Sequence, residues 1–197
     1  MVSVIIPYDK DRGFLDEAIL SVHRQTYKDW ELILEHSDGF FGANMNRGIV
    51  KARGEFIKML AEDDELTPDC LKILVNGIQG YDFVYSDAEN FGDLSPGWPA
   101  YSRDKTTTLQ EMLKGNCIHG GTTLYRRDMF LEAGGYNERL WTAEEYDLHL
   151  RLMKKGYKHR HVKGIVYRYR IHESNKSMQA NRVARRKYIK QIQMKYV

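Results

Sequence analysis

The chain has 197 residues, of which 42% are hydrophobic, so it is long enough to bury the core of one domain. Its 30 basic residues are nearly balanced by 27 acidic ones, and the formal net charge of +3 argues against a dedicated nucleic-acid-binding protein. The two cysteines, Cys70 and Cys117, lack metal-binding spacing and indicate neither a disulfide framework nor a zinc site. The apolar run at residues 2–6 is too short for a signal peptide or a membrane span, so we expect a cytoplasmic protein.

Short β-branched runs alternate with helical patterns through the first half of the chain. We expect strands at residues 2–6, 30–34, 55–60 and 82–85. Helices are expected between them, at residues 15–22, 44–51 and 67–78. This alternation builds a Rossmann-like, mostly parallel sheet with helices on both faces. Ligands of such sheets bind at the carboxyl ends of the strands, which here carry residues 7–9, 35–39 and 61–64.

The second half of the sequence is less regular. After a loop at residues 92–103 we expect a short helix near 109–113, a strand at 122–126, a helix at 144–155, an extended segment at 161–169 and a terminal helix at 180–196. The predicted fold class is α/β, with one domain over residues 1–197. Its nucleotide-binding half covers about 1–90, its acceptor and catalytic half about 91–178, and a basic terminal helix about 180–197.

Four consecutive acids, residues 62–65, follow the third expected strand. Carboxylates packed on one turn repel each other, so a fold that keeps them there commonly supplies a cation. Asp63 and Asp64 are the two candidates to bind Mg²⁺ or Mn²⁺, which prefer oxygen ligands and take several from phosphates and water. A solvated acidic loop, with one of the two aspartates capping the following helix, fits this run equally well.

The terminal helix carries six cations: Arg182, Arg185, Arg186, Lys187, Lys190 and Lys195. This sign asymmetry allows peripheral contact with an anionic membrane, which would suit a lipid-linked acceptor. A solvated helix face is the more common explanation, and we favour it.

Several segments in order closely resemble the family-two glycosyltransferases, which are inverting enzymes with the GT-A fold. They are VSVIIPY at 2–8, TYKDWELI at 26–33, NRGIVKARGEFI at 46–57, the acids at 63–64, GGYNE at 134–138 and EEYDL at 144–148. Each motif alone is weakly specific, but the ordered set is strongly so.

The resemblance implies a nucleotide site at the ends of the first two strands. Pro7 and Tyr8 match the family's Pro-x-x-Asn turn, in which Asp9 replaces the usual Asn, and Tyr8 is placed to stack on the base. Asp38 corresponds to the acid that contacts the edge of the base, with Glu35 as the second choice because the register is open. Two further residues align near the base and the phosphates: Asn46 and Arg53.

The resemblance also implies the metal and the general base. The family's Asp-x-Asp motif here begins with Ala61, but Asp63 and Asp64 remain as metal ligands. Glu145 occupies the position of the family's catalytic Asp, the base that deprotonates the acceptor hydroxyl, and Glu144 is adjacent. Without the resemblance, both glutamates would be read as acids at the start of a helix.

A late segment, residues 169–177, resembles the loop that closes over the diphosphate. Within it, His172 is a candidate metal ligand or phosphate donor, while Arg170 and Lys176 are candidates to neutralise phosphate charge. His119, beside two glycines, lies where a donor-sugar or acceptor loop would pass.

These expectations define a metal-dependent transfer of sugar from a nucleotide diphosphate sugar, with a UDP-sugar favoured, to the hydroxyl of a glycan, lipid-linked or other acceptor. Cell-surface polysaccharide or glycoconjugate synthesis is the expected setting. A sugar nucleotidyltransferase is the nearest alternative enzyme, although it should carry a Gly- and Arg-rich loop after the first strand. A noncatalytic sugar-nucleotide-binding protein derived from a transferase is the other alternative, supported by Ala61 and by Glu145 in place of Asp.

Overall fold

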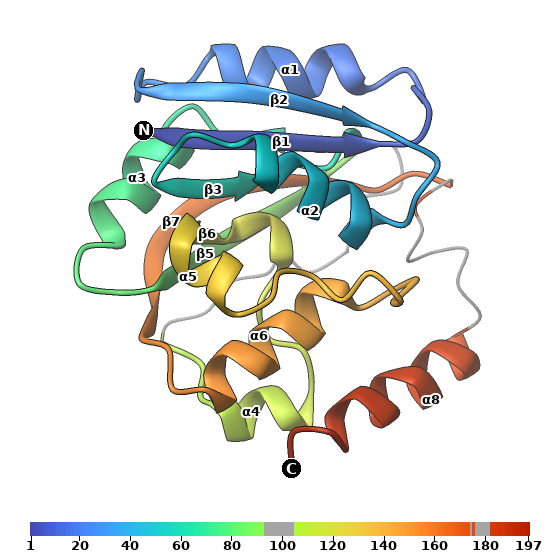
Figure 1. The fold of residues 1–197 in the computed structure, drawn as a ribbon. Coiled ribbons are helices and arrows are strands. Elements are labelled where there is room, and N and C mark those ends of the chain that lie inside the picture. Colours follow the sequence, from blue (N-terminus) through green and yellow to red (C-terminus); the bar gives the residue numbers. More distant parts are fainter. Residues whose placement is uncertain (93–104, 174, 176–181) are drawn as a thin grey trace.

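A computed structural model describes residues 1–92, 105–173, 175 and 182–197 (Figure 1). Its strands are β1 (Val2–Tyr8), β2 (Trp30–His36), β3 (Phe56–Met59), β4 (Glu65–Leu66), β5 (Phe83–Phe91), β6 (Leu124–Arg126) and β7 (His159–Arg170). Its helices are α1 (Leu15–His23), α2 (Phe41–Lys51), α3 (Cys70–Gly77), α4 (Leu109–Lys114), η1 (Gly120–Thr122), α5 (Arg127–Glu132), α6 (Glu144–Lys154) and α8 (Arg182–Gln193).

The seven strands of these residues form one sheet in the order β2-β1-β3-β6-β5-β7-β4. Strand β1 pairs in parallel with β2 and β3, and β5 pairs in parallel with β7. Strands β6 and β4 run opposite to the other five. The predicted mostly parallel α/β sheet is therefore confirmed, with β6 inserted antiparallel between the two parallel groups.

Helices cover both faces of the sheet, as predicted (Figure 1). On one face, α1 and α3 bury Ala18, Val22, Leu71 and Leu74 against the strands. On the other face, α2, α4, α5 and α6 contribute apolar side chains to a second core cluster. The β-branched residues of β1 are fully buried between these layers, which explains the apolar run at the start of the sequence.

The terminal helix α8 packs against α6 near the end of the chain. The Tyr196 hydroxyl donates a hydrogen bond to Asp147 at 2.8 Å, and the Gln193 amide donates to the Tyr146 hydroxyl at 2.9 Å. Ile192 is 1% exposed in this contact. Among the described helices, none combines the length and the apolarity needed to cross a bilayer.

Candidate functional site

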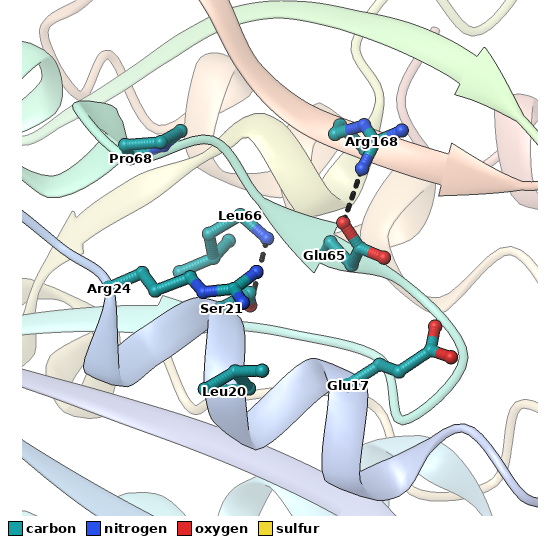
Figure 2. A pocket seen from close by; sticks show the side chains of 8 residues that line it. All are labelled: Glu17, Leu20, Ser21, Arg24, Glu65, Leu66, Pro68 and Arg168. Carbon is teal, nitrogen blue, oxygen red and sulfur yellow. Dashed lines mark hydrogen bonds and ion pairs between the residues drawn. The ribbon is translucent and has the colours of Figure 1, made fainter.

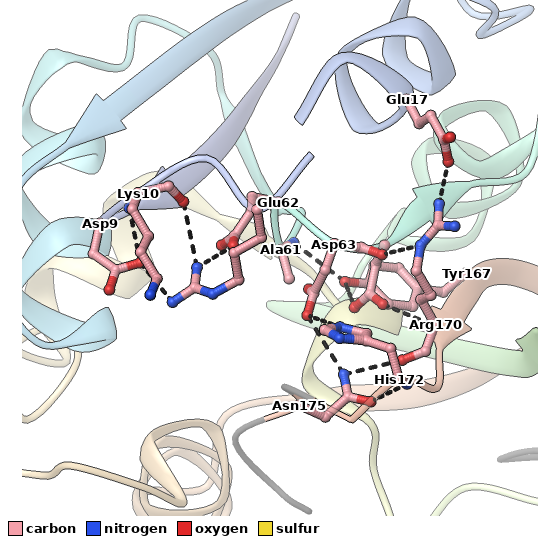
Figure 3. Close-up of polar contacts among 12 residues, drawn as sticks. Asp9, Lys10, Glu17, Ala61, Glu62, Asp63, Tyr167, Arg170, His172 and Asn175 are labelled. Carbon is pink, nitrogen blue, oxygen red and sulfur yellow. Dashed lines mark hydrogen bonds and ion pairs between the residues drawn. The ribbon is translucent and has the colours of Figure 1, made fainter. Parts of the chain in front are cut away.

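The acidic turn lies immediately after β3, at the carboxyl end of the sheet (Figure 3). The Asp63 carboxylate lies with its Oδ2 3.0 Å from His172 Nε2, and the Asn175 amide donates to the same oxygen at 3.5 Å. The side chains of Asp63 and His172 are 20% and 14% exposed. The two residues are 109 positions apart in the sequence, and the fold brings them together at a surface that solvent reaches.

The Asp64 side chain, unlike that of Asp63, is buried in the protein. It is 2% exposed. Its Oδ1 accepts a hydrogen bond from the Arg170 backbone N–H at 2.8 Å, and its Oδ2 accepts one from the Tyr167 hydroxyl at 2.7 Å. Burial and the nearby Asp63 charge raise the pKa of Asp64 well above its ordinary value, against the opposing effect of these hydrogen bonds. Asp64 is thus placed to hold the turn in shape.

The donor set suits a divalent ion that takes few ligands from protein. Within residues 1–92, 105–173, 175 and 182–197, no group of three or more His, Cys, Asp or Glu side chains is arranged to hold a metal. Asp63 and His172 offer one carboxylate and one imidazole on an accessible surface, and Mn²⁺ or Mg²⁺ can take its remaining ligands from phosphate and water. Asp64, the third predicted ligand, is 2% exposed and accepts a hydrogen bond at each carboxylate oxygen, so it is less accessible to an ion than Asp63.

Arg170 stabilises the acidic turn through its side-chain contacts. Its Nε donates to the Asp63 backbone carbonyl at 2.8 Å, and its guanidinium forms ion pairs with Glu17 and Glu65. The same group lies over the rings of Phe14 and Phe91, 4.5 and 4.4 Å from their centroids. These contacts engage the Arg170 guanidinium, the predicted phosphate contact, with acidic and aromatic side chains of the protein. Lys176, the other predicted phosphate cation, falls outside the described residues.

A second charged group lies at the end of β1. Arg12 forms ion pairs with Asp9 and with Glu62, the residue that precedes Asp63. Burial and the Asp63 charge raise the pKa of Glu62 to about 7, although Arg12 opposes the shift. Arg12 and Glu62 were not among the predicted site residues. In the sequence, they are marked only as charged residues beside the expected strand ends.

The expected base-binding residues lie at the neighbouring ends of β1 and β2. The Tyr8 ring lies 4.9 Å from the ring of His36, and Pro7 is paired with Glu35 in the strand register. Glu35 is only 4% exposed and forms ion pairs with cations of α2, whereas Asp38 is exposed in the turn after β2. Of the two acids left open by the sequence, Asp38 is therefore the accessible one.

Asn46 and Arg53, which the resemblance aligns near the base and the phosphates, make contacts within the protein. The Asn46 amide donates to the Tyr136 carbonyl at 2.9 Å and its oxygen accepts from the Tyr136 N–H at 2.9 Å, so it anchors the Gly-Gly-aromatic loop to α2. Arg53 pairs with Glu31 at the amino end of β3, the end opposite the acidic turn. Arg53 therefore lies away from the acidic turn, because the loop before a strand lies at the other edge of a parallel sheet.

The predicted catalytic glutamates begin α6. They follow Ala143, whose φ of 62° makes it the one described non-glycine residue in the left-handed region. Glu144 is 3% exposed, whereas Glu145 is partly exposed and lies against Gly120, where an added Cβ would overlap its side chain. A strained residue held at the start of this helix is typical of functional sites.

The loop that contains Gly120 connects the glutamate to the acidic turn. The His119 ring lies 5.2 Å from the ring of Tyr167 and 5.0 Å from that of Tyr169. Burial and the positive charge of Lys58 lower the pKa of His119 to about 4, so the imidazole is neutral at physiological pH. Tyr167 thus contacts both His119 and Asp64, and the predicted residues His119, Asp63 and Glu145 lie around one corner of the fold.

A separate hollow of about 330 Å³ lies between α1 and β4 (Figure 2). Its lining includes Leu20, Leu66 and the ion pair between Glu65 and Arg168. None of the predicted catalytic or metal-binding residues lines it.

The fold and this corner define a GT-A-like glycosyltransferase architecture. The model for glycosyl transferase family 2 matches residues 34–134, just over half of the chain. The chain therefore belongs to glycosyl transferase family 2, and the resemblance inferred from its sequence is confirmed.

Individual relatives agree with this assignment. The chondroitin synthase of Escherichia coli is 28% identical over 193 residues, which cover 92% of this chain and 27% of that protein. An uncharacterized glycosyltransferase of Rickettsia conorii is 26% identical over 190 residues, which cover 78% of this chain and 31% of that protein. The chain thus spans less than a third of either relative.

A solved structure shows the same fold. The S. aureus TarS 1-349 fragment in complex with UDP-GlcNAc superposes with a TM-score of 0.74 at 17% identity, covering 91% of this chain and 61% of that one. A complex of the same fragment with UDP gives a TM-score of 0.71.

Proposed function

We propose that this chain transfers a sugar from a nucleoside diphosphate sugar, with a UDP-sugar favoured, to an acceptor hydroxyl and inverts the anomeric configuration. The observation that carries the proposal is the corner in which Tyr167 contacts both the Asp63–Asp64 turn and the His119–Gly120 loop that packs against Glu145. This corner supports the proposal, because the proposed leaving-group site and the proposed base lie close together in it.

The nucleoside is assigned to the ends of β1 and β2. Tyr8 offers an aromatic face for the base, and exposed Asp38 offers acceptor oxygens for its edge. The diphosphate then extends toward Asp63 and His172. Two neighbours with the same fold are described as complexes with UDP-GlcNAc and UDP, which supports a uridine nucleotide as the first choice.

Asp63 and His172 are the residues assigned to a divalent ion, Mn²⁺ or Mg²⁺. Such an ion offsets the negative charge that develops on a departing diphosphate. The protein holds the two ligands in place through Asn175, which donates to the Asp63 carboxylate and accepts from the His172 backbone N–H. Asp64 and Arg170 fix the backbone of the turn beneath them.

Glu145 is assigned as the general base. It takes the proton from the acceptor hydroxyl while the acceptor oxygen forms a bond to the anomeric carbon. The bond from that carbon to the diphosphate oxygen breaks on the opposite face, and the electron pair leaves with the nucleoside diphosphate. One displacement of this kind inverts the configuration. Its setting is polysaccharide or glycoconjugate synthesis, for which the similarity to a chondroitin synthase is the support.

The test compares Glu145→Gln with the wild type and with Glu132→Gln, a change at an exposed glutamate of α5. Donor affinity is measured by calorimetry with UDP-GlcNAc and Mn²⁺, and turnover is measured as release of UDP with and without candidate acceptors. We expect Glu145→Gln to lower turnover about 100-fold or more with donor affinity nearly unchanged, since a positioned general base contributes about 10²–10⁴-fold. Glu132→Gln should match the wild type.

Two outcomes would contradict the proposal. Equal loss of donor binding and turnover in Glu145→Gln would remove its role as the base. Donor binding without UDP release by the wild type, across a panel of UDP-sugars and acceptors, would favour a noncatalytic binding protein.

A further inference from the structure

Lys58 is a buried cation in the middle of β3, a strand whose other members are apolar. Its side chain is 0% exposed. Burying an ammonium group is costly unless its protons find acceptors. Here Nζ donates to two backbone carbonyls, those of Met59 at 2.9 Å and of Gly121, and it lies 5.2 Å from the centroid of the Tyr167 ring.

The bond to Gly121 reaches the loop that contacts the proposed base. Gly121 and Gly120 are packed so closely that an added Cβ would overlap the Tyr167 ring at the first and the Glu145 side chain at the second. The Gly121 N–H also donates to His119 Nδ1 at 3.2 Å. A shift of the Gly121 carbonyl would therefore be transmitted to Glu145 through the adjacent glycine.

The contact with Tyr167 reaches the acidic turn. The Tyr167 hydroxyl donates to Asp64 Oδ2 at 2.7 Å and accepts from the Ala61 N–H at 3.2 Å. The Asp64 carboxylate is close enough to Lys58 to favour the charged form of the lysine. The Lys58 ammonium group thus contacts both the Gly120–Gly121 loop and Tyr167, which binds Asp64.

We propose that Lys58 is a positioning residue of the transfer site, which fixes the Gly120–Gly121 backbone beside Glu145 relative to the Tyr167–Asp64 pair beneath the metal-binding turn. This inference rests on the function proposed above. It assigns a role to a lysine that contacts neither the donor nor the acceptor. Its effect on transfer is indirect, through the distance and orientation of two other groups.

The ionisation of Lys58 adds a second consequence. Burial lowers its pKa to about 8, against the opposing effect of Asp64 and Cys70. The other titratable groups that face it are Tyr167 and His119. Lys58 is therefore protonated at neutral pH, and turnover should fall as the pH rises through about 8, because a neutral amine binds the Gly121 carbonyl and the Tyr167 ring more weakly than the ammonium group does.

The test uses Lys58→Met, with Lys72→Met on the exposed side of α3 as the matched control. Methionine has a similar length and removes the buried ammonium group, but it leaves the Met59 and Gly121 carbonyls without this donor, so some loss of stability is expected. Urea unfolding checks that the variant is folded under the assay conditions. We expect kcat to fall about 10-fold or more, as for other small misplacements of catalytic groups, with donor affinity within about 3-fold of the wild type. The fall in turnover near pH 8 should disappear in this variant and persist in Lys72→Met.

A measurement that does not need activity completes the test. Amide hydrogen exchange should become about 10-fold faster for the peptide covering residues 119–123 in Lys58→Met, beyond any uniform change across the protein, because local protection there depends on the Lys58 bond. Unchanged exchange in this peptide would overturn the inference even if the protein proved noncatalytic. Faster exchange with an unchanged kcat and pH profile in an active protein would overturn it as well. Absence of turnover in the wild type would count against the proposed function alone.

Discussion

The hydroxyl of Tyr167 donates a hydrogen bond to the buried Asp64 carboxylate, with 2.7 Å between the two oxygens. The same hydroxyl accepts from the Ala61 N–H at 3.2 Å, so it satisfies both a charged and a backbone group of the acidic turn. The fully buried Tyr167 thus stabilises a turn in which the adjacent residue, Asp63, is partly exposed to solvent.

Tyr167→Phe should destabilise the protein by about 1–3 kcal/mol, the usual cost of leaving buried polar groups without a partner. Urea unfolding of Tyr167→Phe, Asp64→Asn and the double variant measures this as a double-mutant cycle. We expect a coupling energy between the two residues, as for other groups in one hydrogen-bond network. Additive effects would show that the 2.7 Å contact carries little of the stability.

Asp63→Asn and Asp64→Asn should have different consequences, although the residues are adjacent. Asp63→Asn should abolish the extra thermal stabilisation that Mn²⁺ gives with UDP and change the melting temperature without ligand less than Asp64→Asn does, because the Asp63 side chain is 20% exposed and Asp64 is buried. Asp64→Asn should lower that melting temperature, because it disrupts two buried hydrogen bonds. Differential scanning fluorimetry measures both, with Glu173→Gln at an exposed position as the control. The reverse pattern would indicate that Asp64, rather than Asp63, binds the metal.

The left-handed conformation of Ala143 should affect the free energy of unfolding. Ala143→Gly should be neutral or stabilising by up to about 1 kcal/mol, since glycine pays no steric cost at positive φ but has more freedom in the unfolded chain. Ala143→Val should cost about 1 kcal/mol or more, because a β-branched side chain is disfavoured there. Equilibrium unfolding in urea compares the two. Equal stability of the glycine and valine variants would indicate that this backbone relaxes in solution.

His149 should make the protein sensitive to acid. Burial and the nearby His159 lower the pKa of His149 to about 3, so the folded state keeps it neutral while the unfolded state binds a proton below about 6.5. Stability from this group is therefore lost as the pH falls from about 6.5 toward 3, at about 1.4 kcal/mol per pH unit. The raised pKa of Glu62 acts in the opposite sense between about 4.5 and 7.

The measurement for His149 is the difference between His149→Gln and the wild type, which cancels the contribution of Glu62. Glutamine cannot take up the proton and can still reach the Tyr125 hydroxyl, which His149 Nε2 contacts at 2.7 Å. Unfolding free energies at pH 7.5, 6 and 5 should fall less steeply in the variant. Parallel curves would place the acid sensitivity elsewhere.

The sequence predicted the first half of the fold well, because each of its elements carries a local signal. The β-branched run at the start became β1, and the apolar spacing of residues 15–22 became α1. The end of β5 was missed: the expected strand at 82–85 extends to Phe91, since pairing with β7 overrides the polar composition of residues 86–90. Strand β4, with two residues, has no pattern to detect.

The roles of individual site residues were harder to predict, because they depend on contacts between distant segments. Two adjacent aspartates look alike in sequence, and only the approach of β7 places Asp63 beside His172 and Asp64 beneath Tyr167. Lys58 looked like one polar residue in an apolar run. The role proposed for it depends on a hydrogen bond that it donates to the carbonyl of Gly121, 63 positions later.

The long sequence separation of these contacts bears on how the protein is made. The residues that complete the acidic turn follow it by 103 to 109 positions. A nascent chain released as far as β5 lacks all three residues that contact Asp63 and Asp64 in the folded protein, Tyr167, Arg170 and His172. Formation of this site is therefore a late event of folding, and contacts of such separation are the slow ones to form. Nucleotide sugar binding should consequently appear only after β7 has been synthesised and added to the sheet.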